Sequence, residues 1–201
     1  MNLAITEHDG PAVNELTDTV IVPLYEATHA DQLDNPFDST ERFVERLHAY
    51  ASRDGFALAL ARDEPGVPVG QAFGYPLPAG SRWWDGLITD VPDGFTTETG
   101  TRTFALTELM VHPDHQRQGI ARTLHDRLLT ARPEQRATLL VHADNTAART
   151  AYTHWGWDVA GQLRPFPDSP TYDALLPRPT PARRLTGTHG CCAEVNRAAR
   201  P

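Results

Sequence analysis

The sequence predicts one α/β domain built on a mixed sheet. At 201 residues the chain is long enough for one well-buried domain and too short for two ordinary ones. Stretches that alternate apolar and polar residues, typical of strands, are interspersed with longer stretches in which apolar residues recur every three or four positions, typical of helices. We expect the domain to span residues 1–178. Residues 179–201 are rich in Pro, Arg, Thr and Ala without an apolar period, which predicts a disordered tail.

The N-terminal half is expected to hold a strand, two helices and a hairpin. Residues 2–7 alternate in polarity, and residues 11–29 carry apolar side chains at helical spacing. Asp38-Ser39-Thr40-Glu41 resembles a capping box, so a second helix is expected to begin near Asp38 and to continue through Tyr50. Strands at residues 56–61 and 69–75 are expected to pair around a turn-rich Asp-Glu-Pro-Gly segment.

Two connecting segments are candidates for ligand contacts. Residues 30–37 form an acidic connector between the two helices, and residues 76–103 form a long excursion that contains Trp83 and Trp84. Connections of that length in compact domains are often lids or binding loops. The alternative is a surface excursion whose tryptophans cap the core.

The C-terminal half alternates strands and helices. Strands are expected at residues 104–111, 138–143, 158–163 and 171–176. An amphipathic helix carrying Leu124 and Leu128 on its apolar stripe lies between the first two of these strands. A second helix follows Ala143.

The run from Gln116 to Arg122 is typical of a phosphate-binding loop. It lies between an expected strand and an expected helix, and Gly119 lacks the side chain that would block close approach of a pyrophosphate to backbone N–H groups. Those N–H groups are the unpaired donors at the start of a helix. Arg117 and Arg122 flank the glycine and can neutralise phosphate oxygens.

The pattern Gln-x-x-Gly-x-Ala in this run, preceded by His112-Pro113-Asp114, resembles the GNAT superfamily of acyl-CoA-dependent N-acetyltransferases. Downstream, Asn145-Thr146-Ala147-Ala148 runs through Tyr152 to Trp155-Gly156-Trp157, which resembles the family's second block. Two blocks in the right order are more specific than either alone.

The resemblance implies a mostly antiparallel sheet flanked by helices, with splayed central strands, and acetyl-CoA as co-substrate. It implies that backbone groups of Leu109, Met110 and Val111 bind the pantetheine arm, as a sheet edge binds a peptide. It also implies that the loop binds the pyrophosphate, through Arg117, Gln118, Gly119, Ile120, Ala121 and Arg122.

Asn145 and Tyr152 are assigned roles by the same resemblance. Asn145 is expected to contact the cofactor, and Tyr152 to stand near its sulfur, where a phenol can protonate the leaving thiolate. Their spacing is close to two helical turns, so both can share one helix face. The alternative is that Asn145 is an N-cap and Tyr152 an ordinary amphipathic residue.

Glu108 is the candidate general base. Strand alternation predicts that it shares a face with Phe104, Leu106 and Met110, where apolar neighbours would raise the pKa of its carboxyl. Two alternatives stay open, an exposed or arginine-paired Glu108 and a base that is a water molecule.

Charge and cysteine content limit the partners. The net charge of −8 disfavours nucleic acid and anionic membranes, and no apolar run approaches the roughly 20 residues that span a bilayer. The N-terminus lacks an export signal, so the expected location is the cytoplasm.

Cys191 and Cys192 are adjacent and lack metal-ligand spacing, so no metal is expected. The five histidines in or near the two blocks are assigned to surface and loop roles: His112, His115, His125, His142 and His154.

These observations favour an enzyme that transfers an acetyl group from acetyl-CoA to a primary amine by direct attack. The acceptor is expected to be a small cationic metabolite or an amine-bearing antibiotic, held between the connector 30–37 and the Trp83-Trp84 excursion. The alternatives are a non-catalytic acyl-CoA sensor and a protein N-terminal acetyltransferase. Monomer and homodimer both stay open.

Overall fold

The computed structural model describes residues 2–130, 132–165 and 169–178. Within them one mixed sheet of seven strands forms, in the order β1-β2-β3-β4-β5-β7-β6. Every neighbouring pair is antiparallel except β4 and β5, so the expected fold class is confirmed. The strands are β1 (Ala4–His8), β2 (Ala57–Arg62), β3 (Pro68–Pro76), β4 (Thr103–Val111), β5 (Arg136–His142), β6 (Trp157–Leu163) and β7 (Tyr172–Pro177). All of the expected strands are present, with small shifts at their ends.

The first helical segment is interrupted by a wider turn. α1 (Gly10–Leu16) and α2 (Val22–Thr28) are joined by a π-helical turn at Thr17–Ile21, which the sequence pattern did not predict. The side chain of Asp9 caps α1 by accepting from Ala12 N at 3.3 Å.

α3 (Thr40–Ala51) begins one residue later than its capping pattern predicts. Ser39 is the N-cap, and its hydroxyl accepts from Arg42 N at 3.3 Å. The predicted capping box of Asp38 and Glu41 is therefore wrong. Asp38 precedes the cap, and its carboxylate is left to face a cavity.

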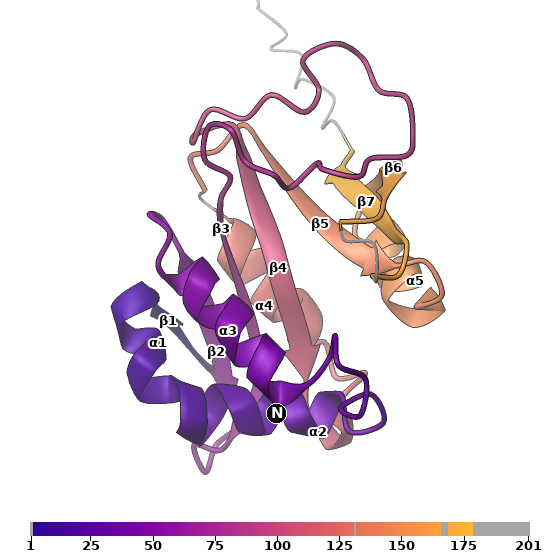
Figure 1. Ribbon diagram of the computed structural model, residues 1–201. Helices are drawn as coiled ribbons and strands as arrows, with labels where there is room; N and C mark the ends of the chain where they lie inside the picture. The colour runs from indigo at the N-terminus through magenta and orange to yellow at the C-terminus, as the bar shows by residue number, and fades with distance from the viewer. Residues whose placement is uncertain (1, 131, 166–168, 179–201) are drawn as a thin grey trace, which may run out of the picture.

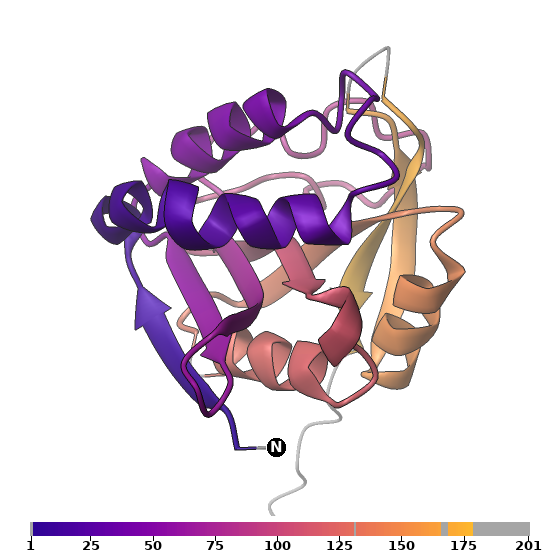
Figure 2. The same cartoon turned by 90° about the horizontal axis from the view of Figure 1, so that it is seen from below.

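Helices cover the sheet on both faces (Figure 2). α1, α2 and α3 cover one face. Phe43 and Leu47 of α3 pack in one core cluster with Leu58 and Phe73 of the sheet. α4 (Ile120–Leu129) covers the opposite face with its expected apolar stripe, including Leu124 and Leu128. α5 (Thr146–His154) packs beside β6.

The parallel pair at the centre of the sheet is short. β4 and β5 pair only from Thr103↔Arg136 to Leu106↔Leu139, and beyond that the two strands diverge (Figure 1). The divergence begins where β4 carries a bulge at Thr107, since Phe73 pairs with Glu108 and the next residue, Gly74, pairs with Leu106. The Thr107 hydroxyl donates to the Phe73 carbonyl at 3.1 Å, which keeps β4 attached to β3 through the bulge.

The bulge corrects one prediction about Glu108. Phe104 and Leu106 face the α4 side of the sheet, whereas Met110 faces the α1–α3 side. Glu108 shares its face with Met110 but not with Phe104 and Leu106, because the extra residue reverses the alternation. The prediction of one common face was therefore wrong.

The long segment between β3 and β4 is fastened by a buried carboxylate. Glu98 accepts from the Trp84 indole N–H at 2.9 Å, from the Thr103 hydroxyl at 2.9 Å and from Arg136 at 3.0 Å. Trp84 is buried in this cluster, whereas its neighbour Trp83 lines the cavity. Trp83 is partly buried against the core and also reaches the cavity, whereas Trp84 is fully within the packed cluster.

No helix in the described part of the chain is long and apolar enough to cross a membrane. The expected tail at 179–201, with Cys191 and Cys192, lies outside the described residues.

Candidate active site

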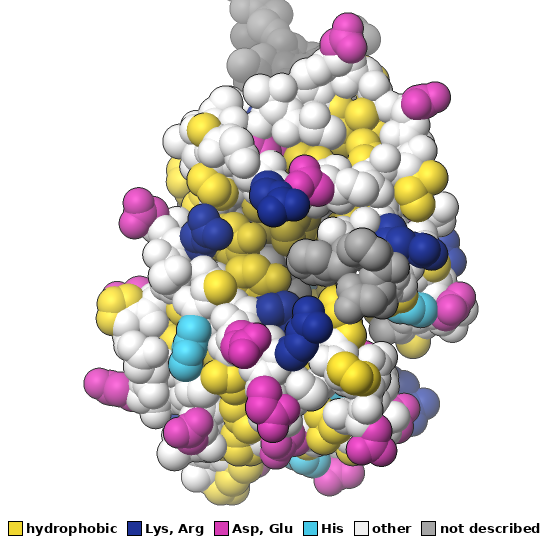
Figure 3. Space-filling model, in the orientation of Figure 1, with side chains coloured by type: hydrophobic (Ala, Val, Ile, Leu, Met, Phe, Trp, Pro, Cys, Tyr) yellow, Lys and Arg dark blue, Asp and Glu magenta, His cyan; other side chains and the backbone are white. Residues whose placement is uncertain are grey.

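A cavity of about 1750 Å³ occupies the gap where β4 and β5 diverge. Figure 3 shows this face hollowed, with apolar side chains on its floor and arginine and acidic side chains around it. One half is lined by the end of β4 and by α5, and the other by the connector, α3 and the start of the long segment. Glu108, Leu109, Met110, Val111, Asn145 and Tyr152 all line it, so the structure brings together residues predicted from separate parts of the sequence.

The backbone of β4 is exposed to this cavity beyond the last pair with β5. Leu109, Met110 and Val111 pair with β3 on one side only. Among the described residues, no strand pairs with their other side. That edge can therefore receive an extended, amide-containing ligand through backbone hydrogen bonds.

The loop after β4 adopts the conformation that its glycine predicts. Gly119 has φ 82° and is the N-cap of α4, which has no side-chain capping hydrogen bond. A Cβ placed on Gly119 would have nothing within 4 Å, so the space next to the helix start is open. Arg117, with φ 58°, is also left-handed. Open space beside uncapped N–H donors at a helix N-terminus suits an anion.

The side chains of residues 117–122 offer fewer groups for a phosphate than the sequence suggested. The guanidinium of Arg122 donates to Asp126 at 2.6 Å and stacks over Trp155. Ile120 is buried in the core, and Gln118 donates to the Asp114 carbonyl at 3.3 Å. Residues 117–122 follow the end of β4 and are not part of the cavity lining. The loop therefore offers mainly backbone donors, with the Arg117 side chain exposed.

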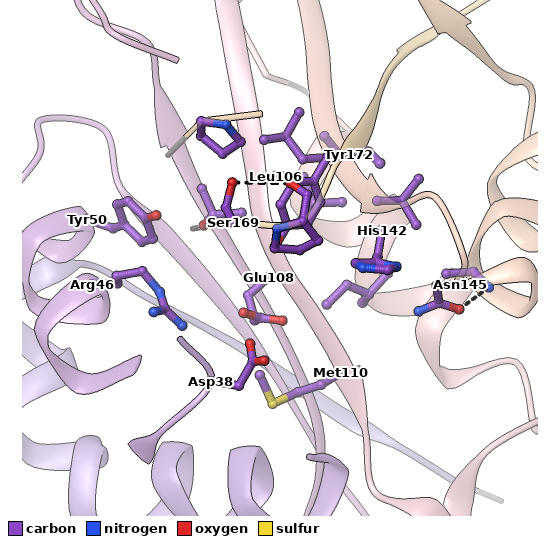
Figure 4. A pocket seen from close by; sticks show the side chains of 18 of the residues that line it. Asp38, Arg46, Tyr50, Leu106, Glu108, Met110, His142, Asn145, Ser169 and Tyr172 are labelled. Atoms are coloured by element: carbon purple, nitrogen blue, oxygen red, sulfur yellow. Dashed lines mark hydrogen bonds between the residues drawn. The ribbon is translucent and has the colours of Figure 1, made fainter. Parts of the chain in front are cut away.

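α5 positions Asn145 and Tyr152 on the cavity. Asn145 caps the helix by accepting from Ala148 N at 3.0 Å and still lines the cavity (Figure 4). The Tyr152 side chain is held by edge-to-face contacts with Trp155 and Trp157, at centroid distances of 5.4 and 6.1 Å. Burial, and then the charge of Glu108, raise the pKa of the Tyr152 phenol. Tyr152 therefore keeps its proton at neutral pH and can act as a donor.

Glu108 faces Asp38 across the other half of the cavity, and Arg46 points toward both from α3 (Figure 4). Burial raises the pKa of the Glu108 carboxyl, and the charges of His29 and Arg46 oppose that rise while Asp38 adds to it. A carboxylate with a raised pKa is a stronger base than an exposed one.

Asp38 and Arg46 were not among the predicted site residues. Asp38 was assigned to a helix cap, and Arg46 had no assigned role. Arg46 follows Phe43 by three residues and precedes Tyr50 by four, so helical spacing already put a charge on the apolar side of α3.

His125 also departs from its predicted role. It was expected at the surface or in a loop, but it lies on α4 with 6% exposure. The Trp157 indole N–H donates to its Nε2 at 3.0 Å, and Nδ1 lies 2.8 Å from a carboxylate oxygen of Asp126. Because an indole can only donate, the proton belongs on Nδ1. Neutral His125 thus joins α4 to the strand that follows α5.

Within the described residues no cluster of three or more histidine, cysteine, aspartate or glutamate side chains could hold a metal ion.

Comparison with known proteins agrees with this geometry. Residues 23–157 match the Acetyltransferase (GNAT) family. The chain belongs to the GNAT acetyltransferase family. A search of curated proteins found none that matches it.

Solved structures share the fold at low sequence identity. An acetyltransferase from Thermus thermophilus is 13% identical, with a TM-score of 0.59 over 88% of this chain and 96% of that one. A Corynebacterium glutamicum protein described as histone acetyltransferase HPA2 and related acetyltransferase is 15% identical, with a TM-score of 0.59 over 90% and 99%. The PaiA N-acetyltransferase from Thermoplasma acidophilum, solved with coenzyme A, is 13% identical, with a TM-score of 0.53 over 88% and 99%.

We expect this GNAT acetyltransferase to lose stability at mildly acidic pH through His125. Burial lowers the pKa of His125 below its ordinary value of about 6.5, although Asp126 opposes the shift. The folded state then binds fewer protons at this site than the unfolded state, so the free energy of unfolding falls as the pH drops below that value. Urea unfolding at neutral and mildly acidic pH should show this slope, and His125→Gln should flatten it.

The matched control is His154→Gln, which changes an exposed histidine at the end of α5. It should leave the slope intact. An unchanged slope in His125→Gln would remove His125 as the source of the acid sensitivity.

Proposed function

We propose that this GNAT acetyltransferase moves the acetyl group of acetyl-CoA to the primary amine of a small acceptor by direct attack. The observation that supports this most is that Glu108 and Tyr152, from separate elements, line one cavity between the diverging strands. The first can accept a proton and the second can donate one.

The residues present fit acetyl-CoA as co-substrate. The β4 edge at Leu109, Met110 and Val111 would bind the pantetheine amides, and the N-terminus of α4 beyond Gly119 would bind the pyrophosphate. Asn145, at the start of α5, lines the same cavity. When bound, the co-substrate supplies a thioester whose carbonyl carbon an amine can attack.

Two side chains carry the proton transfers in this proposal. Glu108 takes a proton from the acceptor ammonium, and the freed amine nitrogen forms a bond to the acetyl carbonyl carbon. Tyr152 donates its phenolic proton to sulfur as the carbon–sulfur bond breaks, and it regains a proton from the acetylated nitrogen. The products are an N-acetyl amine, the free thiol and one proton left on Glu108, which passes to water.

The acceptor end of the cavity favours an ammonium. The carboxylates of Asp38 and Glu108 face each other there (Figure 4). Asp31 of the connector and Trp83 of the long segment also line the cavity. These features support a cationic acceptor, either a small metabolite or an amine-bearing antibiotic.

The decisive experiment is a thiol-release assay with acetyl-CoA and a panel of primary amines, with the acetylated product identified by mass spectrometry. Release that depends on one class of amine supports the proposal. If acetyl-CoA binds and no amine releases thiol, a non-catalytic acyl-CoA sensor replaces it.

The loop assignment is tested at Gly119. Gly119→Glu puts negative charge and bulk beside the helix start, so acetyl-CoA binding should be abolished in a folded protein. Gly119→Asn is the matched control, since asparagine tolerates a left-handed backbone, and it should retain most of the affinity. Calorimetric titration measures both. Equal affinity for Gly119→Glu and wild type would disprove the cofactor assignment.

The proton donor is tested by Tyr152→Phe, which keeps the ring and its contacts with both tryptophans. We expect kcat to fall by roughly 10- to 1000-fold with little change in acetyl-CoA affinity, because only the donated proton is lost. Steady-state kinetics under conditions where chemistry limits turnover give the comparison. A wild-type kcat would exclude Tyr152 from the proton transfer.

The general base is tested by Glu108→Gln. Wild-type kcat/KM for the acceptor should decline as the pH falls through the pKa of Glu108, which burial raises above its ordinary value. In Glu108→Gln this acidic decline should be absent, and kcat/KM should be about 100-fold below that of wild type. The difference should be largest at pH values just above the pKa of Glu108, where the wild-type carboxylate is ionised and free amine is scarce. The pH profiles of both proteins decide the matter. If they coincide, the base is a water molecule or the amine arrives neutral.

A further inference from the structure

Arg46 faces two carboxylates, those of Asp38 and Glu108, without forming an ion pair with either. Its guanidinium donates to the carbonyl of Phe37 at 2.9 Å and lies over the ring of the same residue, 5.1 Å from the centroid. Within the described part of the chain no ion pair joins Arg46 to Asp38 or Glu108. All three side chains nevertheless face the same cavity (Figure 4).

Among the other partly buried arginines of the described residues, Arg132, Arg136 and Arg149 pair with carboxylates, whereas Arg62 and Arg102 donate to backbone carbonyls. Arg132 lies 3.0 Å from Glu134, and Arg136 lies 3.0 Å from Glu98. Pairing of this kind offsets the cost of removing charges from water. Arg46 likewise donates to a backbone carbonyl, but it also faces two carboxylates in the cavity without forming an ion pair with either.

Arg46 and the two carboxylates influence one another electrostatically although they form no ion pair. Arg46 lowers the pKa of Glu108 while Asp38 raises it, so both charges act on the Glu108 carboxyl from a distance. Arg46 also acts on the hydroxyls of Tyr50 and Tyr172, whose pKa values are raised mainly by burial. All five tyrosines of the chain line this cavity, and their rings exclude water from much of its wall.

Other cations on the cavity are less suited to a ligand. Arg82 pairs with Asp85 at 2.7 Å, and Arg53 is exposed beyond the end of α3. Arg46 is partly buried and fixed through Phe37, so its remaining guanidinium donors have a set direction. A planar guanidinium with parallel N–H donors can bind the two oxygens of an oxyanion at once.

We propose that the acceptor carries an oxyanion besides its reacting amine, with the oxyanion bound by Arg46 and the ammonium by Asp38 and Glu108. This rests on the proposed acetyl transfer and narrows its cationic acceptor to an ampholyte, such as an amino acid or an aminoalkyl phosphate. The amine lies at the Glu108 end because that carboxylate faces the reaction centre. The oxyanion lies toward α3.

The test compares matched acceptors. Amino acids, their carboxamides, aminoalkyl phosphates and diamines of similar length are assayed for thiol release. We expect the best acceptor to bear an oxyanion, with kcat/KM at least about 10-fold above its neutral counterpart, as expected for a charge-assisted pair. The carboxylate and phosphate arms distinguish the two sources of the oxyanion. A carboxamide or diamine as the best acceptor would overturn the proposal.

Two variants locate the effect. Arg46→Gln should lose the preference for the oxyanion, whereas Arg42→Gln should keep it. Arg42 lies on the same helix and also stacks on Phe37, at 5.6 Å, but it does not line the cavity. Unchanged preference in Arg46→Gln would mean that Arg46 only balances the charge of the carboxylates.

Acceptor binding, measured apart from turnover, distinguishes failure of the ampholyte site from failure of acetyl transfer. The same panel is titrated by NMR into the protein saturated with coenzyme A. Preferential binding of oxyanion-bearing amines without turnover keeps the ampholyte site and refutes acetyl transfer. Turnover of diamines or amides alone keeps acetyl transfer and refutes the ampholyte site, and equal binding of all members without turnover refutes both.

Discussion

The short pairing between β4 and β5 is the constraint on which the rest of the site depends. Four residue pairs join the strands, and the bulge at Thr107 follows immediately after the last of them. Backbone groups of Leu109, Met110 and Val111 on the β5 side are then without a strand partner in the described structure. Unpaired backbone groups away from water cost free energy comparable to a lost hydrogen bond. The amide-containing arm of the proposed co-substrate would relieve that cost, so the divergence of the strands is the feature that would allow it to bind.

The same bulge also decides on which face of the sheet Glu108 lies. Without the extra residue, Glu108 would lie on the α4 side with Phe104 and Leu106, inside a packed apolar core. With it, Glu108 turns to the face covered by α2 and α3, where Asp38 and Arg46 lie. One inserted residue thus moves a carboxylate from a site where it would be buried alone to one where it faces an open cavity.

Much of the fold was predictable because each element carries a local pattern. Apolar periodicity located the strands and α4, and Gly119 marked the loop because only a residue tolerant of positive φ suits that turn. The bulge at Thr107, the cap at Ser39 and the burial of His125 were not predictable in this way. The bulge and the buried histidine depend on partners distant in sequence, Phe73 for Thr107 and Trp157 for His125, whereas the Ser39 cap has a local partner in Arg42 and differs from the expected cap by one residue. The approach of Asp38 to Glu108 depends on tertiary packing and leaves no trace in local spacing, whereas the helical spacing of Arg46 with Phe43 and Tyr50 was a signal that the sequence did offer.

The charges of the acceptor half are fixed in place before any ligand binds. The Tyr25 hydroxyl donates to the backbone carbonyl of Asp38 at 2.7 Å, and Arg46 donates to the carbonyl of Phe37, so the end of the connector is attached to two helices. Holding Arg46 away from Asp38 and Glu108 gives up an ion pair that would stabilise the fold. The proposed ampholyte would interact with both charges without having to order the side chains first. The hydrogen bonds at the end of the connector thus place both charges on one cavity without joining them in an ion pair.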